Sequence, residues 1–328
     1  MNRPPASSTG ARIGLHVGRA AAAYGFTRAA QPGKIHLLAP DRFEVYWDEL
    51  EKRGLASKIL PFEAPTATDE ELARFHTPDY LRWMRAACAV DQPSLDQGPT
   101  PAQPHIPAAA AAVAGACLDA ARRLARGDFD AAFLPIAGFH HAWPERARQY
   151  CAINDSGVLL RFLAPARVAY VDIDAHLGDG VLGGAGRDAG LFIVDVHQRA
   201  RTFWYSKFDD DEPDEPLPTA QHHVVALEPR SGDDAFFATW DLAIRSIERH
   251  RPEWVVLNAG VDGLKGDLLG GLRYTSAVHR RVIADLLGLA RGRLIVVGGG
   301  GYGAKRAASG WCEVTAALLE HSSSIPGG

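Results

Sequence analysis

Residues 167–180 read RVAYVDIDAHLGDG, an apolar run that turns acidic at its end and finishes in glycines. The apolar half predicts a buried β-strand. Because strand side chains alternate between two faces, we expect Asp172, Asp174 and His176 to point the same way. Burying two carboxylates and an imidazole together is unfavourable unless a bound group compensates for their lost hydration. The stretch therefore predicts a divalent metal site at the end of a core strand.

Other short apolar runs accompany this one, and amphipathic segments separate several of them. They are ARIGLHV (11–17), AAFLPI (131–136), LFIVDV (191–196), HHVVAL (222–227), WVVLNAG (254–260) and RLIVVGG (293–299). Apolar strands bounded by helices are typical of a parallel sheet covered on both faces. We therefore predict an α/β fold, a mostly parallel sheet with helices on both faces.

The remaining pattern places helices and loops and indicates no second domain. Helical spacing is found in 41–54, 69–75, 79–90, 107–126, 234–250, 274–290 and 311–321. Residues 92–107 contain five prolines and 206–220 are acidic, so both are expected to be surface loops. We predict a flexible leader at 1–10, one domain over 11–322 and a tail at 323–328.

The composition of the chain limits its class. The 328 residues are 47% hydrophobic and 23% charged, with a formal net charge of −4, so neither a nucleic-acid footprint nor adhesion to anionic membranes is indicated. No apolar run reaches the roughly 20 residues that cross a bilayer. The four cysteines are far apart and form no C-x-x-C pair, which is typical of reduced core residues and predicts a cytoplasmic location. The sequence leaves open whether the chain forms a homo-oligomer.

Chemically reactive residues follow four of the predicted strands, where open α/β sheets bind their ligands. His140 and His141 follow the first of these strands, and Asp179 follows the Asp174–His176 pair. Taken singly, these features have structural explanations such as a surface histidine pair, an ion pair, a helix cap or turn packing. Their coincidence at one edge of one sheet favours a functional site. The residues after the other two strands are Asp262 and the run Gly300-Gly301-Tyr302.

Asp174, His176 and Asp262 form an oxygen-rich ligand set with one nitrogen. Three protein ligands that leave a position open are typical of catalytic metal sites. Zinc is favoured, although the same set would hold iron(II) or another divalent ion. Such an ion would polarise a substrate carbonyl and activate water, while His141 or His140 would transfer the proton. Tyr302 would then donate a hydrogen bond to the developing oxyanion.

The glycines at 298, 300 and 303 match the G-x-G-x-x-G fingerprint of dinucleotide-binding folds. That motif requires a following strand with an acidic residue roughly 20 positions on. Only residues 304–328 follow, and WCEVTAALLEH (311–321) is helical in pattern. A nicotinamide cofactor is therefore excluded.

In order along the chain, six motifs resemble those of the zinc-dependent histone deacetylase superfamily, including bacterial deacetylase-like and acetoin-utilisation-type amidohydrolases. The resemblance implies the arginase/deacetylase-like α/β fold and removal of an acetyl or other acyl group from an amine. Acetyl-lysine, a polyamine or a small metabolite would be such substrates. The motifs are HLLAPDR (36–42), FHTPDYL (75–81), GFHHAWPERARQYCAIND (138–155), VDIDAHLGDG (171–180), AGVDGLKGD (259–267) and GGGGY (298–302).

Carried over residue by residue, the resemblance implies roles for single side chains. Asp174, His176 and Asp262 would bind zinc, and Tyr302 would be the catalytic tyrosine. His140 would pair with Asp172 and His141 with Asp179, with His141 as the main general base and acid. The pocket would be formed by Tyr150, Trp204 and Gly300, with Arg42 in a channel behind the metal. A potassium site would use Asp172, Asp174, His176, Asp195 and Val196.

The chain departs from the family pattern at several positions. Leu177 replaces a histidine, Gln149 a glycine, Asp195 a serine, and Trp204 a smaller phenylalanine that lines the tunnel. Pro99 lies near the place where eukaryotic members keep an aspartate that grips the peptide backbone, and Asp96 is the nearby substitute. We expect Trp204 to narrow the tunnel.

Two alternatives remain open on the sequence. Asp-Ala-His (174–176) is similar to the metal motif of ureohydrolases, but their binuclear manganese site needs D-A-H-x-D, and Gly178 occupies the last position. A catalytically silent acyl-lysine-binding protein would keep the pocket without turnover. Metal counting separates the first alternative from a deacetylase, and turnover separates the second.

Overall fold

The computed structural model describes residues 12–27, 38, 40–199, 202–203 and 222–321. Its centre is an eight-stranded sheet in the order β2-β1-β3-β8-β7-β4-β5-β6, and every pairing is parallel. The predicted parallel α/β fold is therefore confirmed. The strands are β1 (Ile13–His16), β2 (Leu60–Phe62), β3 (Ala131–Leu134), β4 (Val168–Asp172), β5 (Leu191–Gln198), β6 (His222–Leu227), β7 (Trp254–Asn258) and β8 (Leu294–Val297).

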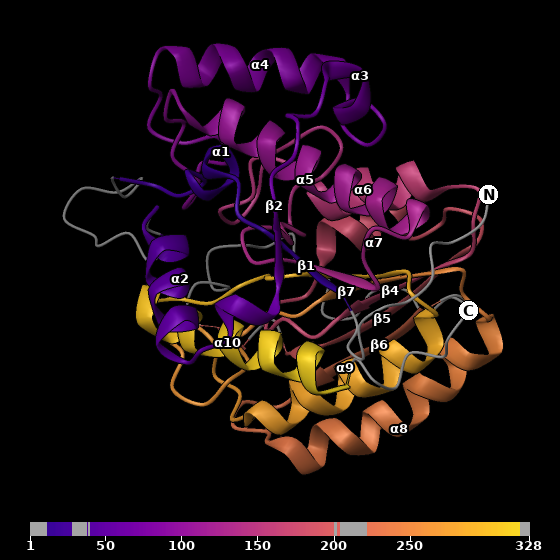
Figure 1. Cartoon of the computed structure of the whole chain (residues 1–328). Helices are drawn as coiled ribbons and strands as arrows, with labels where there is room; N and C mark the ends of the chain where they lie inside the picture. Colours follow the sequence, from indigo (N-terminus) through magenta and orange to yellow (C-terminus); the bar gives the residue numbers. More distant parts are fainter. Residues whose placement is uncertain (1–11, 28–37, 39, 200–201, 204–221, 322–328) are drawn as a thin grey trace.

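Helices cover both faces of the sheet, as Figure 1 shows. The helices on one side pack on one another around the longest helix, α5. These are α1 (Arg19–Ala22), α3 (Asp69–Leu72), α4 (Pro78–Ala89), α5 (Ile106–Arg126), α6 (Asp155–Leu163) and α7 (Asp179–Ala185). The other side carries α2 (Arg42–Lys52), the short 3-10 helix η1 (Ala56–Lys58), α8 (Asp233–His250), α9 (Ser276–Ala290) and α10 (Ala304–His321).

Local sequence signals account for where several helices begin and end. Thr68 and Glu71 form a capping box at α3, and Thr77 caps α4 one residue before Pro78. Gly127 closes α5 with a φ of 77°, the left-handed conformation that glycine adopts without strain. Each central strand is buried along its whole length, which explains why these strands are continuously apolar.

The structure corrects the expected length of one strand. Strand β4 ends at Asp172, so Asp174 and His176 lie in the loop that follows it. Strand alternation therefore does not bring these side chains together; hydrogen bonds within the loop do so. In the described ranges, no helix combines the length and the apolar character that crossing a bilayer requires. The predicted leader and the predicted tail lie outside the described residues.

Candidate active site

The site lies at the carboxyl ends of β3, β8, β7 and β4, which are neighbours in the middle of the sheet. The loop after β3 carries His140 and His141, and the loop after β4 carries Asp174 and His176. Asp262 follows β7, and Tyr302 follows β8. The carboxyl ends of parallel strands meet at one edge of a sheet, so these residues converge although they are far apart in sequence.

Asp174, His176 and Asp262 form a buried cluster whose ligand atoms all lie within 4.8 Å of one another. The Nδ1 atom of His176 is 2.8 Å from Oδ2 of Asp262 and 3.0 Å from Oδ1 of Asp174. The three side chains are at most 4% exposed. Among the residues that the structure describes, no other group of His, Cys, Asp or Glu side chains converges in this way.

Backbone amides orient the two carboxylates of the cluster. The amide of Ala175 donates to Oδ1 of Asp262 at 2.8 Å, and the amide of Gly300 donates to Oδ2 of Asp174 at 2.6 Å. A Cβ atom at Gly300 would lie 2.3 Å from Oδ2 of Asp262, so only glycine allows this approach. Gly300 thus positions the carboxylates of the cluster, in addition to lining the pocket.

The electrostatics of the cluster suit a cation. Burial lowers the pKa of His176, but Asp262 and Asp174 outweigh that effect and raise the pKa to about 10. Burial raises the pKa of Asp174, yet the positive charges of His140 and His176 bring it well below its usual range. Burial and the charge of Asp174 raise the pKa of Asp262 to about 7. The site therefore attracts positive charge, and two carboxylates with one imidazole fit a divalent ion.

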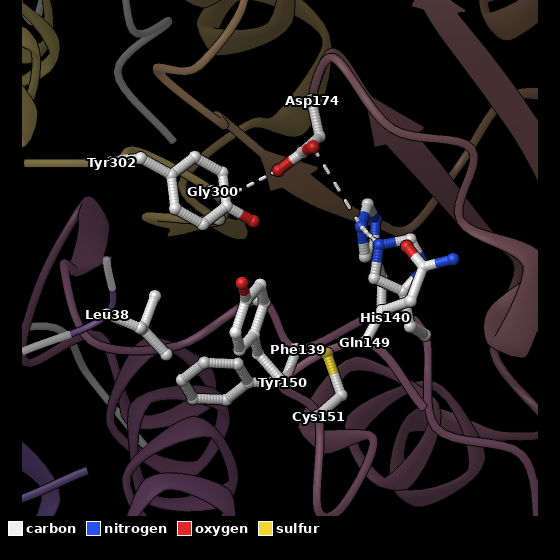
Figure 2. Close-up of a pocket in the computed structure, with 12 residues that line it drawn as sticks. Leu38, Phe139, His140, Gln149, Tyr150, Cys151, Asp174, Gly300 and Tyr302 are labelled. Carbon is white, nitrogen blue, oxygen red and sulfur yellow. Dashed lines mark hydrogen bonds and ion pairs between the residues drawn. The ribbon is translucent and has the colours of Figure 1, made fainter. Parts of the chain in front are cut away.

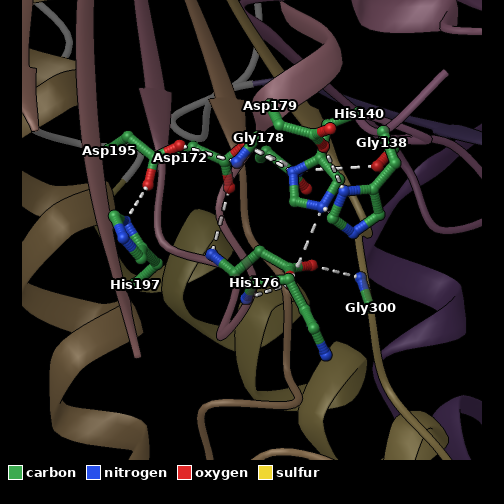
Figure 3. A network of polar contacts seen from close by, with 12 residues as sticks. Gly138, His140, Asp172, His176, Gly178, Asp179, Asp195, His197 and Gly300 are labelled. Atoms are coloured by element: carbon green, nitrogen blue, oxygen red, sulfur yellow. Dashed lines mark hydrogen bonds and ion pairs between the residues drawn. The ribbon is translucent and has the colours of Figure 1, made fainter. Parts of the chain in front are cut away.

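Two histidine–aspartate pairs lie beside the cluster, and Figure 3 shows their network. Nδ1 of His140 lies 2.8 Å from Oδ2 of Asp172, and Nδ1 of His141 lies 2.7 Å from Oδ1 of Asp179. The two Nε2 atoms are 3.1 Å apart. Since two lone pairs facing each other would repel, one of these nitrogens carries a proton that it donates to the other.

The pKa values assign that proton to His140. Burial lowers the pKa of His140, but Asp172 and Asp174 outweigh burial and raise the pKa to about 10. Burial and the neighbouring charge of His140 lower the pKa of His141 to about 4. At neutral pH, His140 is therefore a cation and His141 is neutral, with its Nε2 lone pair accepting the hydrogen bond from Nε2 of His140.

The aspartates of the two pairs are themselves held in place. Asp172 accepts hydrogen bonds from Tyr170 Oη at 2.7 Å and from Asn258 Nδ2 at 3.1 Å. The second oxygen of Asp179 accepts from Trp143 Nε1 at 3.0 Å and forms an ion pair with Arg148 at 2.9 Å. These contacts fix the orientation of both imidazole rings.

Residues that the sequence analysis quoted without a role hold the double-histidine loop (residues 138–143). Asn154 donates from Nδ2 to the carbonyls of His140 and Ala142, at 3.1 Å and 2.9 Å. Asp155 accepts from the amides of Gly138 and Phe139, both at 2.8 Å. An Asn-Asp pair before the apolar run of α6 is a recognisable N-cap signal, and it could have located this helix start.

His76 supports Asn154 in turn. Its Nε2 atom accepts from the amide of Asn154 at 2.8 Å, while Nδ1 lies 3.3 Å from the carbonyl of Pro144. The neutral ring with its proton on Nδ1 satisfies both contacts. Burial lowers the pKa of His76 to about 4.

This neutral His76 leads to a prediction about acid stability. The folded pKa lies below the ordinary value of 6.5, so the unfolded chain binds more protons between these two pH values. The stability that His76 contributes is complete above about pH 6.5 and is lost as the pH falls towards 4, by at most about 3 kcal/mol. Urea unfolding at pH 7.5 and pH 5 measures how much the free energy of unfolding falls between these two pH values. This fall should be smaller for His76→Gln than for the wild type. Equal losses would contradict the prediction.

A pocket with ≈ 300 Å³ of open space lies against these groups (Figure 2). Tyr150 and Tyr302 are on its wall, with ring centres 6.0 Å apart. The amide of Tyr302 donates to Oδ2 of Asp267 at 2.9 Å, which positions the tyrosine in its loop. Phe203, which the sequence analysis missed, stacks on His176 with ring centres 4.5 Å apart. Trp204 lies outside the described residues.

The wall residue Tyr150 has an unusual backbone. Gln149 and Tyr150 have φ angles of 44° and 69°, so two successive side-chain-bearing residues are left-handed. Each such residue costs about 1–2 kcal/mol relative to its ordinary conformation. The surrounding structure must therefore hold this pair in place.

Arg42 is 1% exposed and lies 5.5 Å from the ring centre of Trp311. Its Nε and Nη1 atoms are buried and have no hydrogen-bond partner among the residues that the structure describes. Burial lowers the pKa of Arg42 to about 10, which leaves it a cation at neutral pH. A buried cation with two nitrogens that no described residue satisfies is suited to an anionic ligand.

Asp195, expected in the potassium set, lies across from Asp172 in the β4–β5 register. Its carboxylate accepts from the amide of Gly178 at 2.9 Å and pairs with Nδ1 of His197 at 2.7 Å. His197 lies outside the sequence motifs given above. Val196, the neighbouring strand residue of the set, is buried.

Three comparisons with known proteins agree on one family. The histone deacetylase domain model matches residues 36–318. Histone deacetylase 8 of Danio rerio is 30% identical over 301 residues, covering 88% of this chain and 79% of that protein. Histone deacetylase RPD3 of Saccharomyces cerevisiae is 27% identical over 307 residues, covering 87% of this chain and 68% of that protein.

A solved structure shows the same fold. The crystal structure of the HDA15 HD domain superimposes with a TM-score of 0.82, at 22% identity, covering 95% of this chain and 90% of that one. Sequence and fold thus point to one assignment: the chain belongs to the histone deacetylase family and is a deacetylase, a hydrolase.

Proposed function

We propose that the protein is a zinc-dependent amidohydrolase that removes an acetyl or other acyl group from an amine. The observation that carries the proposal is the convergence of Asp174, His176 and Asp262 beside two histidine–aspartate pairs, at a pocket that Tyr302 lines. Acetyl-lysine and an acetylated small amine are both substrates of the proposed class.

In this proposal Asp174, His176 and Asp262 hold one zinc ion per chain. When bound, zinc supplies Lewis-acid polarisation of the acyl carbonyl and of the attacking water. The close contacts of His176 with both carboxylates support the assignment, because they bring three groups that can bind a metal to a common point. The single convergent cluster in the described part of the chain favours one ion over the binuclear manganese site of a ureohydrolase.

The proton transfers are assigned to the histidine pairs. Water takes the place of His140 as the partner of the unprotonated Nε2 atom of His141, and this atom accepts a proton from the water as the water oxygen bonds to the acyl carbon. The carbon–nitrogen bond then breaks, and His141 returns the proton to the departing amine nitrogen. The Asp179 carboxylate stabilises the imidazolium that forms in between. The cation at His140, held by Asp172, adds electrostatic stabilisation to the charge that develops on the acyl oxygen.

The residues of the pocket wall and Arg42 behind the site have separate proposed roles. Tyr302 donates a hydrogen bond to the oxyanion, and Tyr150, Trp204 and Gly300 contact the substrate. Arg42, which has two buried nitrogens without a partner in the described part of the chain, would hold the carboxylate product in a channel behind the metal.

The potassium site of this proposal is formed by Asp172, Asp195, Val196, Asp174 and His176. The chemistry of the donor set suits a hard cation, since Asp172 and Asp195 place two buried carboxylates side by side. We also propose a cytoplasmic location, because the four cysteines are free and buried.

The test is metal analysis combined with a substrate panel. The purified protein should contain about one zinc per chain and should hydrolyse acetyl-lysine, longer acyl-lysines or acetylated small amines. Two manganese ions per chain would favour a ureohydrolase. Full zinc occupancy without turnover of any acyl-amine would favour a silent binding protein.

A further inference from the structure

The left-handed pair Gln149–Tyr150 is held by a hydrogen-bond clamp from a distant loop. The amide of Gln149 donates to Oδ2 of Asp96 at 2.9 Å, and the amide of Tyr150 donates to Oγ1 of Thr100 at 2.8 Å. The Thr100 hydroxyl in turn donates to the same Asp96 oxygen at 2.5 Å. Both amides of the strained pair are thus bound by one carboxylate–hydroxyl unit.

The remaining contacts of the pair close the clamp. Tyr24 Oη donates to the carbonyl of Tyr150 at 2.8 Å. Arg148 and Cys151, on either side of the pair, exchange backbone hydrogen bonds of 3.1 Å and 2.8 Å. The backbone of the pair is therefore fixed at both ends and at both amides. This fixed backbone turns the Tyr150 ring towards the pocket.

The second oxygen of Asp96 is also hydrogen-bonded within the protein. Its Oδ1 atom accepts from Ser94 Oγ at 2.7 Å and from the amides of Gly98 and Thr100 at 2.8 Å and 3.2 Å. Oδ1 therefore organises its own proline-rich loop, while Oδ2 binds the left-handed pair. Such a carboxylate is a structural hub, and five donors already occupy its acceptor directions.

We propose that Asp96 is a positioning residue for the pocket wall, acting with Thr100, and that it does not bind the substrate. It holds the backbone of Gln149 and Tyr150 in the left-handed conformation, so that the Tyr150 ring stands opposite Tyr302 across the pocket (Figure 2). The protein therefore recognises the acyl-amine arm of its substrate without a carboxylate grip from Asp96 on a peptide backbone. This inference rests on the proposed amidohydrolase function.

Two measurements on Asp96→Asn test the proposal. The variant keeps the size of the side chain but replaces one acceptor oxygen by a donor. We expect hydrogen exchange at the amides of Gln149 and Tyr150 to become at least tenfold faster. We also expect kcat/KM to fall by a similar factor, about tenfold, for an acetyl-lysine peptide and for monoacetylated cadaverine. The latter keeps the side-chain arm of acetyl-lysine and lacks the peptide groups.

Further variants separate the clamp from a loss of folding. Thr100→Val removes the hydroxyl that binds the Tyr150 amide and should reproduce the faster exchange with Asp96 intact. Gln149→Gly relieves the left-handed strain, so Asp96→Asn combined with Gln149→Gly should recover most of the activity lost in Asp96→Asn. Ser94→Ala is the matched control, because it removes a contact on the Oδ1 side and should leave exchange at Gln149 and Tyr150 as in the wild type.

Three outcomes would overturn the inference. One is a loss confined to the peptide substrate, which would make Asp96 a substrate-binding group. Another is unchanged exchange at Gln149 and Tyr150 in Asp96→Asn, and the third is the absence of rescue by Gln149→Gly. If the wild type hydrolysed no acyl-amine, the proposed function would fail, whereas the exchange measurements would still decide whether Asp96 clamps the pair.

Discussion

Replacing Tyr302 by phenylalanine is expected to lower kcat by about a hundredfold or more while the zinc content stays complete. Tyr302 lies on the pocket wall, and its ring centre is 5.9 Å from that of His176. Losing one preorganised donor to an oxyanion typically has an effect of this size. Because the proposed role of the hydroxyl is in the transition state, kcat and kcat/KM should fall together. Steady-state kinetics and metal analysis of the same preparation measure both quantities.

Tyr274→Phe is the matched control for this experiment. The Tyr274 hydroxyl is buried and has no hydrogen-bond partner within residues 12–27, 38, 40–199, 202–203 and 222–321, and Tyr274 is not among the residues that line the pocket. Its removal should leave kcat within a factor of about two, since no hydrogen bond to a described residue is lost. If Tyr302→Phe kept the turnover of the wild type, Tyr302 would have no part in the mechanism.

The second large effect is expected for Asp262→Asn, which should lose both bound zinc and activity. Oδ1 of Asp262 accepts from the amide of Ala175, and Oδ2 faces His176. Asparagine keeps the first contact but places a neutral amide among the ligands. Loss of a residue that only hydrogen-bonds to a metal ligand lowers metal affinity about 10–100-fold, and loss of the charge of a ligand itself should lower it further. Isothermal titration of the metal-free protein with zinc measures the affinity directly.

Asp130→Asn provides the control for the aspartate substitution. Asp130 precedes β3, at the end of the strand opposite the site, and pairs with Arg12. This variant should bind zinc with the affinity of the wild type. If Asp262→Asn retained full zinc affinity, Asp262 would not be a ligand, and the proposed metal centre would have to be reassigned.

Most of the fold was predictable because its elements carry strong local signals. The predicted run at 222–227 coincides with β6, and the predicted helix at 107–126 is α5 within one residue. By contrast, β2 was not predicted, since it has three residues, two of them exposed. Strand β4 was predicted too long because Ile173 is as apolar as the strand itself, yet residue pairing with both neighbouring strands, β5 and β7, ends at Asp172.

The site was predictable to the extent that it follows strand ends. Asp174, His176, Asp262 and Tyr302 could be placed at one edge because a parallel sheet gathers its carboxyl ends there. The supporting residues had no comparable signal. Asp96 comes from a proline-rich loop, and nothing local indicates that its carboxylate binds the amide of Gln149, 53 positions away.

The amino-acid sequence by itself determined the parallel α/β architecture and the kinds of side chain available at the sheet edge. Periodicity and apolar runs are local properties, and they need no knowledge of neighbours in space. Only the tertiary structure decided which imidazole carries a proton, which glycine admits a carboxylate, and which aspartate clamps the pocket wall. Those outcomes depend on distances of a few ångströms between segments far apart in the chain, over which burial and charge act strongly.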